Sequence, residues 1–94
     1  MKHHQALFPL GQIVATPGAL DALQAAGQTA HTFLAQHTAG NWGELSDEDW
    51  KENNFAVTRP LRLLSAYRLS TGVKIWLITE ADRSVTTVLL PEDY

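Results

Sequence analysis

Three runs of mainly apolar residues in the last third of the chain predict three consecutive β-strands. The runs are residues 62–69, 73–79 and 84–90. A short loop ending in Gly72 separates the first two runs, and this glycine can take the left-handed conformation that such a hairpin requires. The third run stops at Pro91, which cannot donate a backbone hydrogen bond. The pattern predicts an antiparallel β-meander.

The lengths of the two turns predict which side chains share a face of this sheet. If Leu69 pairs with Val73, one face carries the pairs Tyr67–Ile75, Ser65–Leu77, Val88–Ile75 and Leu90–Val73. The opposite face then carries Leu64, Ala66, Arg68, Lys74, Trp76, Ile78, Val85, Thr87 and Leu89. The second set is less polar than the solvated face of an antiparallel sheet. We therefore expect that the sheet is covered on both sides or exposes an apolar face.

The first half of the chain predicts a strand and a long helix. Residues 10–15 contain Ile13-Val14 and can supply a fourth strand. Thr16 is a helix N-cap candidate, with Pro17 at the first helical position. Helical spacing of apolar residues then predicts one helix over residues 17–38, ending near Gly40. We expect Gly27, inside that helix, to mark a close approach to another backbone.

A second helix is predicted to begin after Ser46, which is followed by three acidic residues in the first turn. Leu45 and Trp50 have the spacing of a hydrophobic staple around this N-cap. The helix must end before Pro60, between residues 53 and 57. The order β-α-α-β-β-β predicts one α+β domain over residues 1–94, with helices on one face of an antiparallel meander sheet and a flexible arm at residues 1–9.

Composition and charge narrow the classes of function. The 94 residues include 7 basic and 10 acidic side chains, for a net charge of −3. This small acidic protein therefore has no electrostatic reason to bind nucleic acid directly. It contains no cysteine, and no signal peptide or membrane span is evident, so we expect a cytoplasmic protein that does not bind a membrane. No motif implies a cofactor.

The histidines and the charged turn at residues 80–83 are candidate sites. His31 and His37 lie six residues apart on the predicted helix and point in different directions, and His3-His4 has no partner, so no metal site is expected. The turn at residues 80–83 is denser in polar groups. There we expect Asp82 to bond the backbone two residues on, and Arg83 to pair with Glu80 across the turn. The simplest interpretation is an ordinary polar turn exposed to solvent. The alternative is that the two carboxylates act as general acid and base in catalysis.

The tryptophan content gives a further indication of where a partner could bind. Trp42, Trp50 and Trp76 are many for so short a chain, and tryptophan is enriched at interface hot spots, although burial in the core is its commoner fate. Trp76 is predicted on the less apolar face of the sheet. The candidate binding residues are Arg68, Lys74, Trp76, Glu80, Asp82, Arg83, Trp42 and His37.

Several stretches of the chain resemble a family of small bacterial proteins. These stretches are residues 10–20, residues 33–37 with Gly40, Trp42 and Gly43, residues 65–67 and residues 75–91. Members of the family are usually called plasmid-related or hypothetical proteins, and some carry a restriction-subunit label. The chain departs from the family pattern at residues 54–60. The resemblance implies a setting in plasmids and other mobile genetic elements, without implying an activity.

Two functional hypotheses follow. The first is a non-enzymatic protein-binding module of a mobile genetic element, acting as an inhibitor of a host defence complex; the anti-defence role is an analogy with other small acidic proteins of such elements. The second is a small ligand-binding protein or enzyme that uses Glu80, Asp82 and Arg83 with His37 or Trp42. A pocket that joins those residues would favour the second hypothesis, and an exposed face around Trp76 would favour the first.

Overall fold

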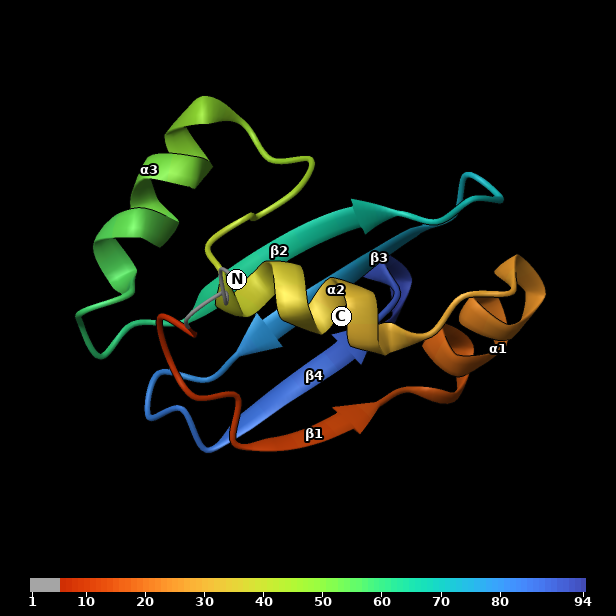
Figure 1. The fold of residues 1–94 in the computed structure, drawn as a ribbon, viewed down its shortest axis with the longest axis horizontal. Helices are drawn as coiled ribbons and strands as arrows, with labels where there is room; N and C mark the ends of the chain where they lie inside the picture. The colour runs from red at the N-terminus through yellow and green to blue at the C-terminus, as the bar shows by residue number, and fades with distance from the viewer. Residues whose placement is uncertain (1–5) are drawn as a thin grey trace, which may run out of the picture.

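The computed structural model describes residues 6–94, and the elements follow the order β-α-α-α-β-β-β (Figure 1). The strands are β1 (Gln12–Ala15), β2 (Leu63–Arg68), β3 (Lys74–Thr79) and β4 (Val85–Leu89). The helices are α1 (Pro17–Ala26), α2 (Ala30–Thr38) and α3 (Asp47–Ala56), and a 3-10 helix, η1 (Pro91–Asp93), follows the sheet. The predicted α+β class is confirmed.

Strands β2, β3 and β4 form the predicted meander. The pairs Tyr67–Ile75 and Ser65–Leu77 lie opposite one another as expected. The second turn spans residues 81–84 and not 80–83, because Glu80 donates its N–H to the carbonyl of Val85 and extends the ladder; Val88 therefore pairs with Leu77 and not with Ile75. The register is therefore displaced by two residues, and an even displacement leaves every side chain on its predicted face.

The fourth strand, β1, makes the sheet mixed and not purely antiparallel. It pairs with β4 in parallel, so the strand order is β1-β4-β3-β2. Gly11 precedes β1 at a φ of 66°, and a Cβ there would lie 2.3 Å from the carbonyl oxygen of Ser84. Only glycine allows the chain to enter the sheet at this point. The predicted strand at residues 10–15 is confirmed, as an edge strand.

The single long helix predicted over residues 17–38 is wrong, because the chain forms α1 and α2 with a break between them. Thr16 caps α1 as expected, its hydroxyl accepting the N–H of Ala19 at 3.1 Å. Gly27 ends α1 at a φ of 66°, and its N–H bonds to the carbonyl of Gln24. A Cβ on Gly27 would have no heavy atom within 4 Å, so this glycine serves the left-handed cap and not a close backbone approach.

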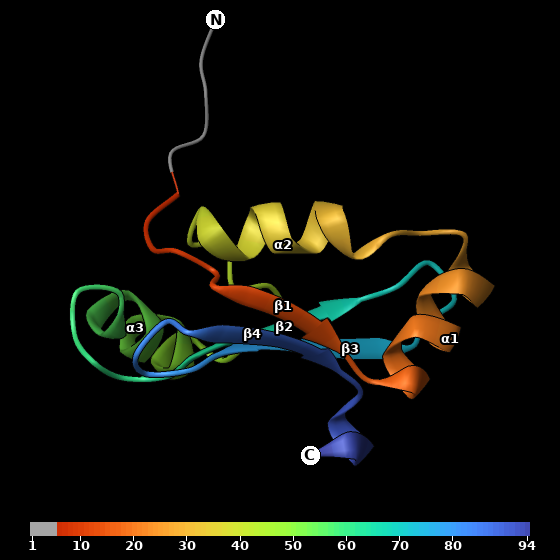
Figure 2. The same ribbon diagram turned by 90° about the horizontal axis from the view of Figure 1, so that it is seen from below.

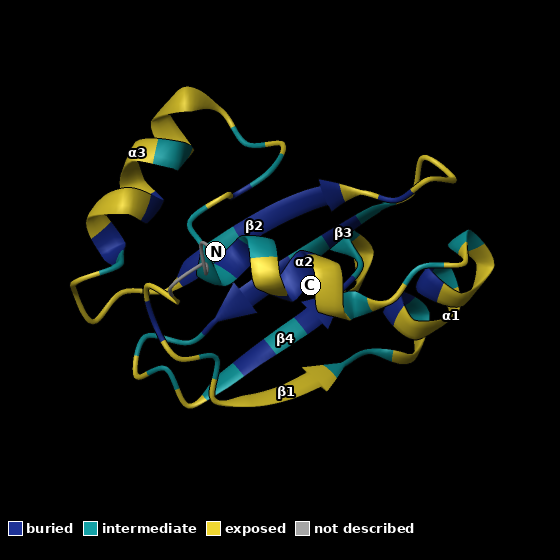
Figure 3. Ribbon diagram, viewed as in Figure 1, coloured by how far each residue is buried: buried dark blue, intermediate teal, exposed yellow. Residues whose placement is uncertain are grey.

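Helix α2 lies across one face of the sheet, and the chain ends on the other side (Figure 2). We call the face under α1 and α2 the inner face; its core residues are Tyr67, Leu69, Ile75, Leu77 and Val88, packed against Ala19, Leu23, Phe33 and Leu34. We call the opposite face, with Leu64, Ala66, Trp76, Ile78, Thr87 and Leu89, the outer face. Buried positions follow the middle of the sheet, and β1 is largely exposed (Figure 3).

Helix α3 begins at the predicted N-cap and lies beside β2. The amide of its Asn53 donates to the carbonyl of Leu64 at 2.7 Å, and its side-chain oxygen accepts the N–H of Leu64 at 3.1 Å. One side chain thus makes the two hydrogen bonds that a neighbouring strand would make. Further along β2, Ala66 bonds to the backbone of Trp42 and Glu44. The edge of β2 that faces α3 is therefore paired at both Leu64 and Ala66.

Replacing Ser46 with alanine should lower the free energy of unfolding by about 0.5–2 kcal/mol. The Ser46 hydroxyl accepts the N–H of Asp49 at 3.1 Å, and alanine leaves that donor to water. Urea unfolding measures the change. Ser46→Asn, which keeps a capping oxygen, is the matched control and should stay close to wild type; equal stability of both variants would show that the cap contributes nothing.

The predicted flexible arm at residues 1–9 is wrong for Phe8. This ring is buried, with its centroid 6.0 Å from that of Trp42 and 5.1 Å from that of His37, and the preceding Leu7 donates its N–H to the carbonyl of Thr38. Residues 1–5, which include His3 and His4, lie outside the described residues. The segment leading into β1 is therefore part of the packed structure from Leu7 onward.

Candidate functional site

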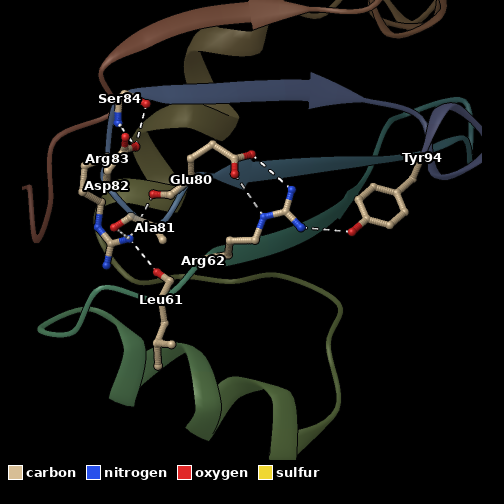
Figure 4. A network of polar contacts seen from close by, with 8 residues as sticks. All are labelled: Leu61, Arg62, Glu80, Ala81, Asp82, Arg83, Ser84 and Tyr94. Atoms are coloured by element: carbon tan, nitrogen blue, oxygen red, sulfur yellow. Dashed lines mark hydrogen bonds and ion pairs between the residues drawn. The ribbon is translucent and has the colours of Figure 1, made fainter.

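The turn after β3 holds three of the candidate residues, but the predicted Arg83–Glu80 side-chain pair is wrong (Figure 4). The Glu80 carboxylate instead accepts two hydrogen bonds, each 3.2 Å long, from the Arg62 guanidinium. Arg62 also donates to the Tyr94 hydroxyl at 3.1 Å. The bonds with Glu80, followed by that with Tyr94, raise the pKa of Arg62. This exposed network ties the start of β2 to the end of the chain.

The Arg83 side chain donates hydrogen bonds to five backbone carbonyl groups, a set of contacts that we call the Arg83 hub. One terminal nitrogen donates to Leu61 at 2.6 Å and to Glu80 and Ala81 at 3.1 and 3.2 Å, and the other donates to Ala56 at 2.8 Å and Arg59 at 2.9 Å. Three of these acceptors belong to the end of α3 and the loop that follows it. Arg83 also has a φ of 61°, which is uncommon for a residue with a Cβ. Its side chain is committed to holding α3 and its loop against the sheet.

Asp82 makes the predicted bond to the backbone two residues on, accepting the N–H of Ser84 at 3.0 Å. It also accepts the Ser84 hydroxyl at 2.6 Å, and these bonds lower the pKa of the Asp82 carboxyl, the hydroxyl bond most of all. The local geometry therefore stabilises an ionised, exposed carboxylate. A general acid needs the opposite shift.

His37 lies in the core, where it joins a chain of hydroxyl groups between α2 and the sheet. Its Nδ1 lies 2.5 Å from the Ser65 hydroxyl oxygen and its Nε2 lies 2.9 Å from that of Thr79. The Thr79 hydroxyl in turn lies 2.7 Å from that of Thr86, and Thr86 donates to the carbonyl of Leu10 at 2.8 Å. His37 is completely buried, and desolvation lowers its pKa to about 4.

The acceptor at the end of this chain sets the direction of its bonds as far as Nε2 of His37. Because Thr86 gives its only hydroxyl proton to Leu10, it must accept from Thr79. Thr79 then accepts from Nε2–H of His37. Burial lowers the pKa of His37 and favours the neutral ring, in which Nδ1 carries no proton and accepts from the Ser65 hydroxyl. Among the described residues, no buried side-chain nitrogen or oxygen lacks a partner, so the chain is closed.

Trp42 is also completely buried. Its ring stacks on that of Phe8 and meets that of His37 edge to face, and its Nε1–H donates to the Asn54 side chain at 2.9 Å. Neither Trp42 nor His37 reaches the turn at residues 80–83 through a described pocket. The two hollows described below are not lined by Glu80, Asp82, Arg83, His37 or Trp42, and a pocket that joins these residues is what would favour the ligand or enzyme hypothesis.

Arg68, Lys74 and Trp76 lie on the outer face of β2 and β3. The Arg68 guanidinium donates to both oxygens of Glu44, at 3.2 and 3.1 Å, and Lys74 lies 3.8 Å from the same carboxylate. The bonds with Arg68 are the main cause that lowers the pKa of Glu44. Trp76 is partly exposed, and its ring lies 5.8 Å from that of Tyr94.

A groove on the same side of the sheet was not predicted. It has a volume of about 700 Å³ and lies between α3 and the start of β2. Its apolar lining residues are Leu45, Phe55, Ala56, Leu61 and Leu64, and its polar ones are Glu48, Asp49, Lys51, Glu52, Asn53 and Arg62. Phe55 and Leu61 are 54% and 46% exposed, so two large apolar side chains open onto the groove. The Arg59 guanidinium stacks on the Phe55 ring, 3.8 Å from the ring centroid.

A second, smaller hollow of about 250 Å³ continues the groove across the sheet. It is lined by Leu63, Trp76, Ile78 and Tyr94, together with Arg62 and Leu64, which also line the first hollow. We call the two together the outer groove. Among the sequence-predicted site residues, only Trp76 lines it. The sequence signals that could have indicated it are Phe55 and Leu61, two large apolar residues in an otherwise polar stretch.

Comparison with models of protein families, with curated proteins and with solved structures finds no match to this chain. The resemblance to plasmid-related proteins therefore stays a prediction. No group of three or more His, Asp or Glu side chains within residues 6–94 is arranged to hold a metal ion. None of the helices described there combines the length and the apolar character that a membrane span requires.

Proposed function

We propose that this chain is a non-enzymatic protein-binding module whose contact surface is the outer groove. The observation that carries the proposal is the exposure of Phe55 and Leu61 in a groove of about 700 Å³. Binding sites of proteins are typically hollows lined by apolar side chains together with a few polar groups. Trp76 and Tyr94 extend the groove with aromatic rings, the side-chain type that is enriched at interface hot spots.

The charge around the groove indicates the chemistry of the partner. Its rim carries the acidic side chains of Glu48, Asp49 and Glu52. Lys51 is the opposing charge on α3, and the charge of Arg62 is balanced by Glu80. A complementary partner therefore presents one or two apolar anchors flanked by Lys or Arg, as an amphipathic basic segment does.

The setting of this binding function rests on the resemblance to plasmid-related proteins. The proposal places the protein in the cytoplasm of a bacterium that carries a mobile genetic element. There it would occupy a basic surface of a host defence complex and inhibit it. Direct binding of nucleic acid is not part of the proposal, because the rim of the groove is acidic and would repel phosphates.

Replacing Phe55 with alanine should weaken partner binding by about 2 kcal/mol or more, the loss typical of a hot-spot aromatic residue. The partner is first captured from host lysate and identified by mass spectrometry, and its affinity for purified wild type and variant is then measured by titration calorimetry. The Phe55 ring is more than half exposed, so the unfolding midpoint should change little.

Leu20→Ala is the matched control, because Leu20 on α1 is also 54% exposed and does not line the outer groove. It should bind like wild type. Trp76→Ala should weaken binding as well, and Glu48→Gln with Glu52→Gln should reduce the salt dependence of binding. Full affinity of the Phe55 and Trp76 variants would rule out the outer groove as the contact surface.

A further inference from the structure

The outer edge of β1 is open. Gln12 donates its N–H to Ser84, and Thr16 donates its N–H to Val88, so both bond to the β4 side. Because backbone groups alternate in direction along a strand, those of Ile13 and Ala15 point away from β4. Within residues 6–94, no hydrogen bond is made to these groups of Ile13 and Ala15. Figure 1 shows β1 as the outermost strand, with no other described segment beyond it.

The two edges of the sheet differ in this respect. On β2, the side chain of Asn53 pairs with Leu64, and the backbone of Trp42 and Glu44 pairs with Ala66. Those contacts occupy the edge that faces α3. An additional strand can therefore join the described sheet only at β1.

The sequence of β1 does not oppose pairing with a copy of itself. Edge strands of monomers are usually protected by charged side chains or an internal proline. Residues 7–20 contain no charged side chain, although the whole chain carries a net charge of −3, and the prolines in this segment lie outside the strand. Ile13 and Val14 are 49% and 38% exposed. Residues 7–20 of two copies can therefore approach each other without bringing like charges of this segment together.

We propose that two copies of the chain associate by antiparallel pairing of β1 with β1 across a two-fold axis. In the register that uses every open group, Ile13 of each copy pairs with Ala15 of the other, and each pair exchanges both N–H···O bonds. Val14 then faces Val14 of the second copy across the axis. The result is one continuous sheet through both copies.

The proposed dimer does not involve the outer groove. The groove lies next to β2, at the opposite edge of the sheet from β1, so the dimer leaves it free on both copies. A four-residue strand buries less surface than the roughly 1,200 Å² typical of stable interfaces. The dimer should therefore form and dissociate with protein concentration in the micromolar range or above.

Cross-linking tests the register directly, because the chain has no cysteine of its own. In a non-hydrogen-bonded antiparallel pair, opposed Cα atoms lie about 4.5 Å apart, which lies within the range that a disulfide spans. Val14→Cys should therefore give a covalent dimer under mild oxidation. Ile13→Cys, similarly exposed but opposite Ala15, is the control and should cross-link far more slowly. Equal rates for the two variants, or no cross-linking of Val14→Cys, would overturn the proposed register.

Sedimentation over a concentration series tests the dimer itself. Wild type should shift from monomer to dimer as its concentration rises, and Ile13→Lys should stay monomeric because two lysines would meet near the axis. Val73→Lys, which places a charge on an exposed apolar residue at the β2–β3 turn, should behave as wild type. Circular dichroism verifies that each variant is folded. A wild type that stays monomeric at millimolar concentration, or a dimer that survives Ile13→Lys, would overturn the proposal.

Discussion

Replacing Arg83 with alanine should lower the free energy of unfolding by about 3 kcal/mol. The guanidinium donates to five backbone carbonyls, and three of them, those of Ala56, Arg59 and Leu61, belong to the end of α3 and its loop. Alanine leaves these acceptors to water and releases α3 from the turn after β3. Chemical denaturation of wild type and variant measures the loss, and amide exchange should rise first in residues 56–61.

Two further substitutions separate the role of the side chain from that of the backbone. Arg83 has a φ of 61°, a conformation that glycine adopts more easily than alanine. Arg83→Gly should therefore be more stable than Arg83→Ala by about 1 kcal/mol, while still lacking the hub. Arg83→Lys keeps the charge but cannot reach both groups of acceptors, so it should recover only part of the loss. Wild-type stability of Arg83→Ala would show that the carbonyl contacts are dispensable.

The elements with local sequence signals could be predicted. Ser46 and Thr16 are capping residues next to helical patterns, and both cap as expected. The meander follows from alternating strands and a glycine turn, since these depend on neighbours in the chain. The break at Gly27 could not be separated from a continuous helix, because the apolar stripe of α1 stays in phase with that of α2 across residues 27–29.

The candidate site was predicted less well, because its contacts join distant parts of the chain. Arg83 and Glu80 have the spacing of a cross-turn pair, and nothing local indicates that five carbonyls would outcompete the carboxylate. Glu80 finds Arg62, which is 18 residues away. The outer groove exists only because Asn53 and Arg83 hold α3 beside β2, which leaves Phe55 exposed. Exposure of that kind is a tertiary property that periodicity does not encode.

Lowering the pH from about 6.5 to about 4 should remove about 3 kcal/mol of stability through His37 alone. Burial depresses its pKa from 6.5 in the unfolded chain to about 4 in the folded protein, so the unfolded state binds the proton more tightly. The stabilisation is complete above about pH 6.5 and is lost as the pH falls toward 4. A tenfold difference in proton affinity corresponds to about 1.4 kcal/mol, which sets the size of the effect.

Protonation also changes the hydrogen bonding of His37. In the neutral ring Nδ1 accepts from Ser65 and Nε2 donates to Thr79, so a second proton on Nδ1 would require the Ser65 hydroxyl to rotate and become the acceptor. The carboxylates of Glu44, Asp82 and Asp93 also have lowered pKa values, each through its hydrogen bonds. These carboxylates stabilise the folded protein at pH values above their unfolded pKa values, which are near 4, and that stabilisation is lost below about pH 4. Their effect therefore falls largely outside the range between about pH 6.5 and 4 in which His37 acts.

A variant without the titrating group isolates the contribution of His37. In His37→Leu with Ser65→Ala and Thr79→Val, apolar groups replace the first three members of the chain, and Thr86 keeps its bond to Leu10. Urea unfolding at a series of pH values should show a steep loss of stability for wild type between about pH 6.5 and 4 and a much flatter profile for the variant. The comparison uses the slope, so a change in absolute stability does not affect it. Equal slopes for the two proteins would mean that His37 becomes protonated in the folded state at little cost, and that its burial does not depress its pKa.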